Sequence, residues 1–307
     1  MTVTETRPGG AHRATGQEQR FDVRRLLPLL LILVGVLGMS YPVTATYFRN
    51  AHQADIAEAY RKSTSTMTEQ DRSEWLARAR EYNENRAGGP ILDPWLARVS
   101  KDNRPYEDYL EQLNPEGDES PFAAVAIPSI DVTLPIYHGT EPDVLTKGVG
   151  HLYGSALPVG GEGMHSVLTG HSGLVDATLF DNLGKVEIGE HFHVDVMGQT
   201  LTYEIDQIEV VLPEETELIQ PEENRDLVTL ITCTPYGINS HRLLVRGTRI
   251  ESDPEAAQEA FAKGAGVWQA WMIGALAALF LALLVWLWLI LRNRRRRRQE
   301  RGAHALD

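Results

Sequence analysis

LVTLITCTPYGINSHRLLVRGTRI, residues 227–250, is the stretch of this chain that decides its fold. Two runs rich in aliphatic and β-branched residues, Leu227–Thr232 and Arg242–Ile250, are separated by a connection that contains Pro, Gly and Asn. This pattern is typical of two strands joined by a loop. If the two strands pair as a hairpin, Arg242 returns to lie beside Cys233, which follows the first run. The stretch therefore predicts a thiol next to a guanidinium group.

Residues 121–251 consist mainly of short segments that read as strands. They are bounded by Gly, Pro, Asn or Asp, as extended segments joined by turns usually are. Besides the two runs above, the predicted strands are 122–127, 132–137, 166–169, 191–196 and 201–211. Many short strands with irregular connections favour a closed barrel or a sandwich. We therefore predict a mainly β domain with one sizeable core at 121–251.

Residues 49–120 read instead as a helical region. Ala51–Tyr60 and Glu69–Tyr82 are rich in Ala, Glu, Arg and Gln, and apolar residues recur at helical spacing within 106–113. A segment rich in helix breakers, which contains Asp93-Pro94-Trp95, interrupts the region. We therefore expect helices on either side of an irregular insertion.

Two uncharged apolar stretches flank these regions, at 26–48 and 267–291. At a helical rise of about 1.5 Å per residue, each can cross a hydrocarbon core of about 30 Å. Tryptophans near both ends of the second stretch suit the membrane–water interfaces. We predict a transmembrane helix at each, with residues 252–266 as the linker before the second.

Arginines gather in the two tails, 1–25 and 292–307. The positive-inside rule then places both tails in the cytoplasm and residues 49–266 outside, in a cell-membrane protein with two spans. The first stretch also resembles a signal-peptide core, with Val43-Thr44-Ala45 as a cleavage site. A retained signal-anchor and a cleaved signal therefore stay open as alternatives.

The formal net charge of −13 hides a marked division along the chain. Residues 49–266 hold 17 basic and 37 acidic side chains, a net charge of −20. Binding to nucleic acid requires a basic surface that neutralises phosphates. This composition excludes nucleic acid as a partner class.

Cys233 is the single cysteine of the chain. Thiols outside the cell usually form disulfides, and this one has no intrachain partner. It is either an inert thiol packed as a small apolar group or a nucleophile. A nucleophilic thiol needs a proton-transfer partner and a donor for the oxyanion. His171, which follows the strand 166–169, and Arg242 would supply both.

Other interpretations of these residues are open at this point. The chain has ten histidines, of which His165 and His241 are rival partners for the thiol, and His191 and His193 alternate on a predicted strand. Arg242 could also be a solvated residue at a strand edge. One cysteine and the absence of a His-x-x-x-His spacing argue against a metal site, and the sequence indicates no cofactor.

The motifs around Cys233 resemble those of the sortase family. Thr229-Leu230-x-Thr232-Cys233 is similar to the sortase signature TLxTC, with Arg242 nine residues downstream, and Thr169-Gly170-His171 resembles the sortase histidine motif. Further segments, within residues 122–250, resemble class C, the pilin-specific sortases: Leu134–Thr140, Gly148–Leu152, Leu157–Gly161 and Cys233–Gly237. Ser172 departs from class C, in which Arg often follows the histidine.

This resemblance implies an eight-stranded sortase-type β-barrel that acts as a cysteine transpeptidase. Cys233 would be the nucleophile, His171 the general acid and base, and Arg242 the stabiliser of the oxyanion. The implied substrates are pilins or surface proteins with an LPxTG-type sorting signal, cleaved between Thr and Gly, and the implied acceptor is a lysine amine of another pilin. Asp93-Pro94-Trp95 resembles the class C lid, in which Asp93 would approach Arg242 and Trp95 would approach Cys233.

Three alternatives to a pilin polymerase remain at the level of the sequence. A housekeeping sortase would attach surface proteins to a cell-wall peptide amine. A cysteine hydrolase would release the free acid, and a non-enzymatic surface scaffold would keep Cys233 inert.

Overall fold

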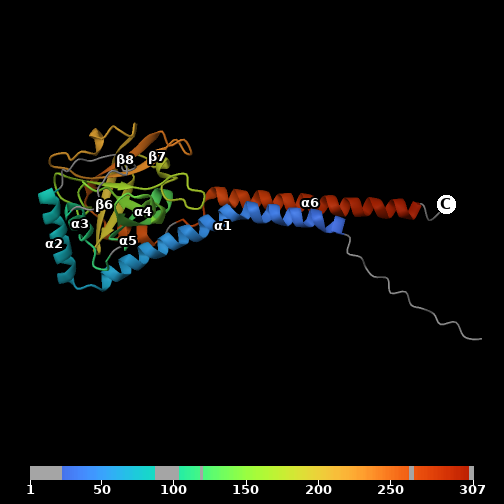
Figure 1. Cartoon of the computed structure of the whole chain (residues 1–307), viewed down its shortest axis with the longest axis horizontal. Helices are drawn as coiled ribbons and strands as arrows, with labels where there is room; N and C mark the ends of the chain where they lie inside the picture. The colour runs from blue at the N-terminus through green and yellow to red at the C-terminus, as the bar shows by residue number, and fades with distance from the viewer. Residues whose placement is uncertain (1–22, 87–103, 118–119, 263–265, 304–307) are drawn as a thin grey trace, which may run out of the picture. The chain divides into compact units, whose positions relative to one another are not determined.

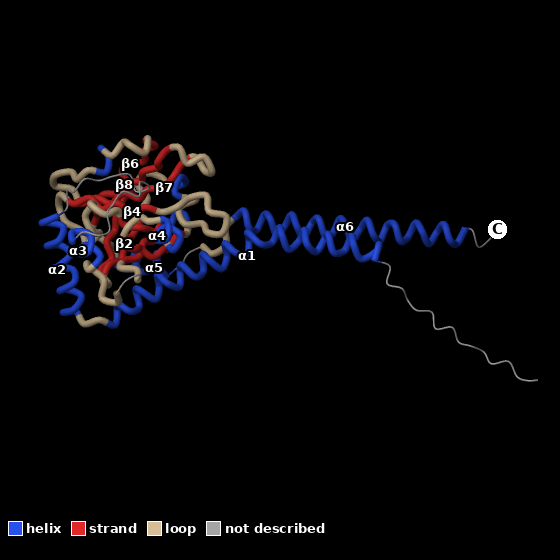
Figure 2. Tube along the Cα trace, viewed as in Figure 1, coloured by secondary structure: helices blue, strands red, loops and turns tan. Residues whose placement is uncertain are grey.

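The structure, a computed structural model, describes residues 23–86, 104–117, 120–262 and 266–303. The chain divides into two compact units, residues 1–40 and residues 41–307. The strands and most helices belong to the second unit, in which the strands form one group with helices around it (Figures 1 and 2).

Eight strands form a closed barrel in the order β1-β2-β3-β4-β7-β8-β6-β5. Two neighbouring pairs, β2 with β3 and β4 with β7, are parallel, and the other pairs are antiparallel. The strands are β1 (Ala123–Ile127), β2 (Val132–His138), β3 (Val149–His151), β4 (Met164–Thr169), β5 (His191–Val196), β6 (Gln199–Val211), β7 (Asp226–Thr234) and β8 (His241–Ile250). The predicted mainly β fold with a closed barrel is confirmed.

Seven of the eight strands lie where the sequence predicts them, with small differences at their ends. β3 is not among the predicted strands; it has only three residues and contains Gly150. A strand this short has too few residues to show alternation of apolar and polar side chains. Its pairing with β2 and β4 is decided by the rest of the barrel.

β1 shows why the helical region belongs to the barrel. All of its residues are buried. Val125 and Ile127 belong to the main core, whereas Ala124 and Ala126 contact Ala57 and Tyr60 of α1 (Val23–Thr66) and Ala260 and Phe261 of α5 (Pro254–Ala262). Small side chains on the outward face of β1 let both helices approach the sheet closely.

The part of α1 from Tyr41 onward is tied to the barrel by buried polar contacts. The Tyr60 hydroxyl donates to the Phe122 carbonyl at 2.5 Å and accepts the Met197 amide at 2.9 Å. Asn50 pairs with Thr178 through its side-chain amide, 2.8 Å from the threonine hydroxyl. The helix is continuous through residue 48, where the sequence analysis placed the end of the first span.

Two further helices cover one side of the barrel. α2 (Glu69–Arg86) and α3 (Arg104–Leu110) lie near one another, with the rings of Tyr82 and Tyr109 6.5 Å apart (Figure 1). Tyr109 is buried, and its hydroxyl lies 2.8 Å from Nδ1 of His151 on β3. The short helix α4 (Pro142–Lys147) connects β2 to β3.

The segment predicted as a linker, 252–266, contains the helix α5. Ala257, Ala260 and Phe261 are buried, so α5 is part of the packed domain. α6 (Ala270–Ala303) follows. Within the described residues, two helical segments are long and apolar enough to cross a membrane: Leu30–Thr66 and Ala270–Arg292. The second agrees closely with the predicted span 267–291.

Candidate active site

Cys233 and Arg242 are direct partners across the β7–β8 pair. The antiparallel register runs without interruption from Leu227–Thr248 to Thr234–His241. Residues opposite each other in such a pair have Cβ atoms about 4.5–5.5 Å apart. The local hairpin therefore places the guanidinium and the thiol on neighbouring strands, as the sequence predicts.

His171 reaches the same end of the barrel on the chain that leaves β4. β4 runs parallel to β7, with Thr169 beside Ile231. Beyond the strand, the Gly170 amide donates to the Ile231 carbonyl at 3.0 Å, and the Thr232 hydroxyl donates to the Gly170 carbonyl at 2.8 Å. The Ser172 hydroxyl donates to the Cys233 carbonyl at 2.7 Å. His171 is thus held between two residues that are both bonded to the strand of Cys233.

Gly170 is required by a close approach to the core. A Cβ atom at this position would lie 2.6 Å from Cδ2 of Phe180, a fully buried ring. The glycine lets the turn with His171 pack directly on that ring. The Thr169-Gly170-His171 motif therefore combines the end of a strand, a close contact with the core and the candidate catalytic side chain.

Arg242 is nearly buried, with 9% of its surface exposed. Its Nη1 donates to the carbonyls of Asn239 and His241, at 3.3 and 3.1 Å. These two bonds hold the guanidinium against its own turn. Burial lowers the pKa of His171, which favours the neutral imidazole.

The rival histidines have other partners. His165 is buried near the opposite end of β4, where Nε2 lies 2.7 Å from the Thr229 hydroxyl and Nδ1 lies 2.9 Å from the Gln220 carbonyl. Nδ1 of His241 contacts the Ser240 hydroxyl at 2.8 Å. His193 lies on β5, 3.0 Å from the Thr202 hydroxyl. Of these histidines, the geometry favours His171.

Two features of the site were missed by sequence reasoning. Ser172 was noted only as a departure from class C, yet it bonds the strand of Cys233. Asp181, whose Oδ1 accepts the Gly173 amide at 2.7 Å, carried no signal in the sequence. The predicted lid, Asp93-Pro94-Trp95, lies outside the described residues. In the part of the chain that is described, no three His, Cys, Asp or Glu side chains gather as a metal site would need.

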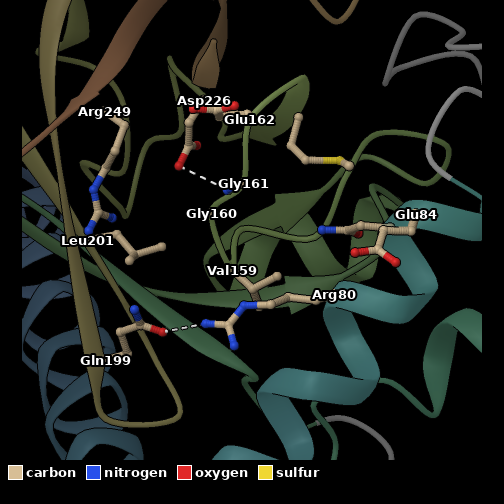
Figure 3. Close-up of a pocket in the computed structure, with 12 residues that line it drawn as sticks. Arg80, Glu84, Val159, Gly160, Gly161, Glu162, Gln199, Leu201, Asp226 and Arg249 are labelled. Atoms are coloured by element: carbon tan, nitrogen blue, oxygen red, sulfur yellow. Dashed lines mark hydrogen bonds between the residues drawn. The ribbon is translucent and has the colours of Figure 1, made fainter. Parts of the chain in front are cut away.

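A separate cavity of about 400 Å³ lies at the opposite end of the barrel (Figure 3). It is lined by Asp226 at the start of β7 and by Arg249 near the end of β8, together with α2. The Gly161 amide donates to the Asp226 carboxylate at 3.0 Å, and Arg80 donates to the Gln199 side-chain oxygen at 3.2 Å. Figure 3 marks both bonds as dashed lines. Cys233 is seven residues beyond Asp226 on β7, which is about 23 Å of extended chain. This cavity is distinct from the candidate active site.

The chain is similar to several known proteins. The family model described as the sortase domain matches residues 125–250. Sortase A from Corynebacterium diphtheriae is 49% identical, with 72% of this chain and 97% of that chain covered at a TM-score of 0.60. Sortase C-1 from Actinomyces oris is 52% identical, with 59% of this chain and 99% of that chain covered at a TM-score of 0.56. Sortase D from Bacillus subtilis is 33% identical over 127 residues, which are 40% of this chain and 61% of that relative.

The barrel, the hairpin that pairs Cys233 with Arg242 and the high identity over nearly whole solved domains agree with one another. The chain belongs to the sortase family of transpeptidases. Its solved relatives include class C sortases from Actinomyces oris and Streptococcus pneumoniae, as well as enzymes named sortase A.

Proposed function

We propose that this protein is a pilin-polymerising sortase of class C. The observation that carries the chemistry is the direct pairing of Cys233 with Arg242, with the His171 turn bonded to the same strand. Similarity to pilus enzymes supports the class. The Streptococcus pneumoniae sortase C, whose structure bears on pilin substrate specificity, is 39% identical, as is a sortase C1 of GBS Pilus Island 1.

In the first half-reaction, neutral His171 takes the proton of the Cys233 thiol, and the resulting thiolate attacks the Thr carbonyl carbon of an LPxTG-type signal. Arg242 donates hydrogen bonds to the oxygen as negative charge develops there. The Thr–Gly C–N bond breaks, and the His171 imidazolium gives its proton to the leaving Gly amine. A thioester between Cys233 and Thr remains.

In the second half-reaction, a lysine amine of another pilin attacks the thioester carbonyl. Neutral His171 accepts the proton that the amine loses, and the C–S bond breaks to release the thiolate. The product is an isopeptide bond that joins two pilin subunits. The lowered pKa of His171 favours the neutral form that this step needs.

The proposed location follows from the two apolar helices and the charges beside them. Arginine-rich tails 1–25 and 292–307 would stay in the cytoplasm, and the barrel would lie outside the cell. In that position the enzyme would meet secreted pilins before they leave the membrane. The predicted lid at Asp93-Pro94-Trp95 would cover the thiol between reactions. The 54% identical sortase A from Corynebacterium diphtheriae has been solved as a lid mutant, so a relative of this chain has a lid.

Mass spectrometry of the full chain in detergent micelles tests the chemistry. With an LPxTG peptide, the wild type should gain the mass of the peptide acyl group on Cys233, and Cys233→Ala should gain none. Added lysine amide should then release the acyl group as an amide. An adduct on Cys233→Ala, or release only as the free acid, would contradict the proposal.

A housekeeping role is the second candidate, because relatives from Corynebacterium diphtheriae and Streptococcus agalactiae bear the name sortase A. Deletion of the gene distinguishes the two. Loss of a high-mass pilin ladder supports polymerisation, whereas loss of cell-wall attachment with intact polymers supports the housekeeping role.

A further inference from the structure

The turn that carries His171 is held from both sides by two consecutive residues. The Phe180 amide donates to the His171 carbonyl at 3.0 Å. The Asp181 carboxylate accepts the Gly173 amide at 2.7 Å. Phe180 is fully buried in the core, so its backbone is a fixed support for the turn. Asp181 fixes the other side of the same turn through its side chain.

The exit of the turn also contacts the loop that follows Cys233. Gly173 has a φ of +83°, a conformation that favours glycine. A Cβ atom there would lie 3.8 Å from the Gly237 amide nitrogen and 3.9 Å from Cε2 of Tyr236. The Ser172 hydroxyl bonds the Cys233 carbonyl one residue earlier. The turn is therefore tied to the core through Phe180 and Asp181, and to the thiol strand through Ser172.

We propose that Asp181 and Ser172 are positioning residues that hold the His171 imidazole in register with the Cys233 thiol. Neither side chain takes part in proton transfer in this assignment. Ser172 and Gly173 are the two residues that follow His171. The Ser172 hydroxyl bonds the Cys233 carbonyl, and the Asp181 carboxylate accepts the Gly173 amide, so the two contacts together hold the turn in place. The inference rests on the proposed role of His171 in the transfer reaction.

The electrostatic surroundings of Asp181 strengthen its bond to Gly173. Burial raises the pKa of Asp181 to about 6, while the Gly173 amide and Lys185 favour the charged form. The carboxylate also faces Tyr236 of the β7–β8 loop, whose pKa is raised mainly by burial and in part by this negative charge. At neutral pH the carboxylate is charged, and a charged acceptor makes the stronger hydrogen bond. Below pH 6 it gains a proton and becomes a weaker acceptor.

Four variants of the full chain in micelles test the inference by steady-state transfer of an LPxTG peptide to a lysine amide. Asp181→Ala removes the acceptor, and Asp181→Asn keeps an oxygen that can accept the Gly173 amide. Ser172→Ala removes the tie to Cys233. Asp176→Ala is the matched control, since Asp176 lies in the same loop but pairs with Arg49 at 2.5 Å.

We expect Asp181→Ala and Ser172→Ala each to lower kcat about 10-fold with little change in KM, because small displacements of a catalytic group are costly. Asp181→Asn should stay within about 2-fold of the wild type, since its amide oxygen replaces the lost acceptor. Asp176→Ala should also stay near the wild type. The deficit of Asp181→Ala should shrink by no more than about 2-fold between pH 8 and pH 5, because the protonated carboxyl, like the Asn amide, keeps an oxygen that can accept the Gly173 amide.

Several outcomes would overturn the inference. Wild-type kcat in both Asp181→Ala and Ser172→Ala would do so, as would an equal loss in Asp176→Ala. If Asp181→Ala fails to fold, Ser172→Ala decides alone: wild-type kcat in that variant would overturn the inference, because removal of one hydroxyl disturbs packing little. Activity of His171→Ala, measured in parallel, would instead contradict the proposed role of His171 itself.

Discussion

The two threonines of Thr229-Leu230-Ile231-Thr232-Cys233 have separate structural roles. Thr229 contacts buried His165 on β4, and Thr232 donates its hydroxyl to the Gly170 carbonyl just before His171. Both residues therefore fasten β7 to the chain that carries the histidine. The two threonines before the cysteine therefore fix the position of the Cys233 strand relative to the turn that carries His171. This would explain why hydroxyl side chains occupy these two positions.

At the scale of single residues, we predict that His171→Ala and Arg242→Ala each lower kcat/KM about 10²–10³-fold, the usual cost of one transition-state donor. Peptide transfer to a lysine amide is the measurement. His241→Ala should retain activity, because its ring contacts the Ser240 hydroxyl beside it.

His165→Ala separates stability from chemistry. The substitution removes the ring nitrogens that contact the buried Thr229 hydroxyl and the Gln220 carbonyl. The free energy of unfolding should therefore fall by about 1–3 kcal/mol. Its kcat should stay near the wild-type value under conditions where it is folded. A folded His165→Ala variant as inactive as His171→Ala would show that the wrong histidine was chosen.

At the scale of elements, the helical region before the barrel connects directly to the predicted lid. α2 ends at Arg86 and α3 begins at Arg104, and Asp93-Pro94-Trp95 falls between them, outside the described residues. Both helices are anchored. Asn83 of α2 donates to the Leu157 carbonyl at 3.0 Å, and Tyr109 of α3 contacts His151. The barrel therefore holds both ends of the segment in which the lid was predicted.

We predict that replacing Asp93 with Ala and Trp95 with Gly together increases the rate at which a small thiol reagent modifies Cys233. Loss of the two expected contacts, to Arg242 and to the thiol, would raise the fraction of molecules with an open site, and apparent affinity scales with that fraction. Labelling kinetics followed by mass spectrometry measure this rate. The melting temperature serves as the control and should stay unchanged; equal labelling rates in the two proteins would refute the lid.

At the scale of the whole molecule, the part of α1 that follows Tyr41 belongs to the folded domain. Tyr60 bonds the Phe122 carbonyl and the Met197 amide, and Arg61 pairs with Asp195 at 3.3 Å. A helix that begins in an apolar stretch thus ends as part of the support of the barrel. The same chain segment would anchor the protein and fix its catalytic domain.

We predict that a chain of residues 41–262 folds without a membrane, whereas residues 67–262 are markedly less stable. The shorter chain loses the apolar contacts of Ala57 and Tyr60 with β1 together with two buried hydrogen bonds. Chemical denaturation followed by circular dichroism compares the two.

Tyr60→Phe in residues 41–262 isolates the hydroxyl and should cost about 1–3 kcal/mol for each buried group left unpaired. Ser65→Ala, which removes an exposed bond within the same helix, is the control. Equal stability of the two truncated chains would refute the structural role of α1.

The sequence by itself determined the parts of this protein that depend on local pattern. The positions of every strand except β3, the two apolar helices and the pairing of Cys233 with Arg242 follow from β-branched runs bounded by turn residues, from length and from a short hairpin connection. Such features are set by neighbours along the chain, so one sequence suffices to find them. For His171, the choice over its rivals also needed the family resemblance.

Only the tertiary structure decided how distant segments support the site. Ser172 and Cys233 are 61 residues apart, and their contact depends on the parallel pairing of β4 with β7. Parallel neighbours are joined by long crossovers, so spacing along the chain does not reveal their register. The three-residue strand β3, the burial of His165 and the bond from Gly173 to Asp181 arise in the same way. Each follows from barrel closure, which brings together groups that no local pattern connects.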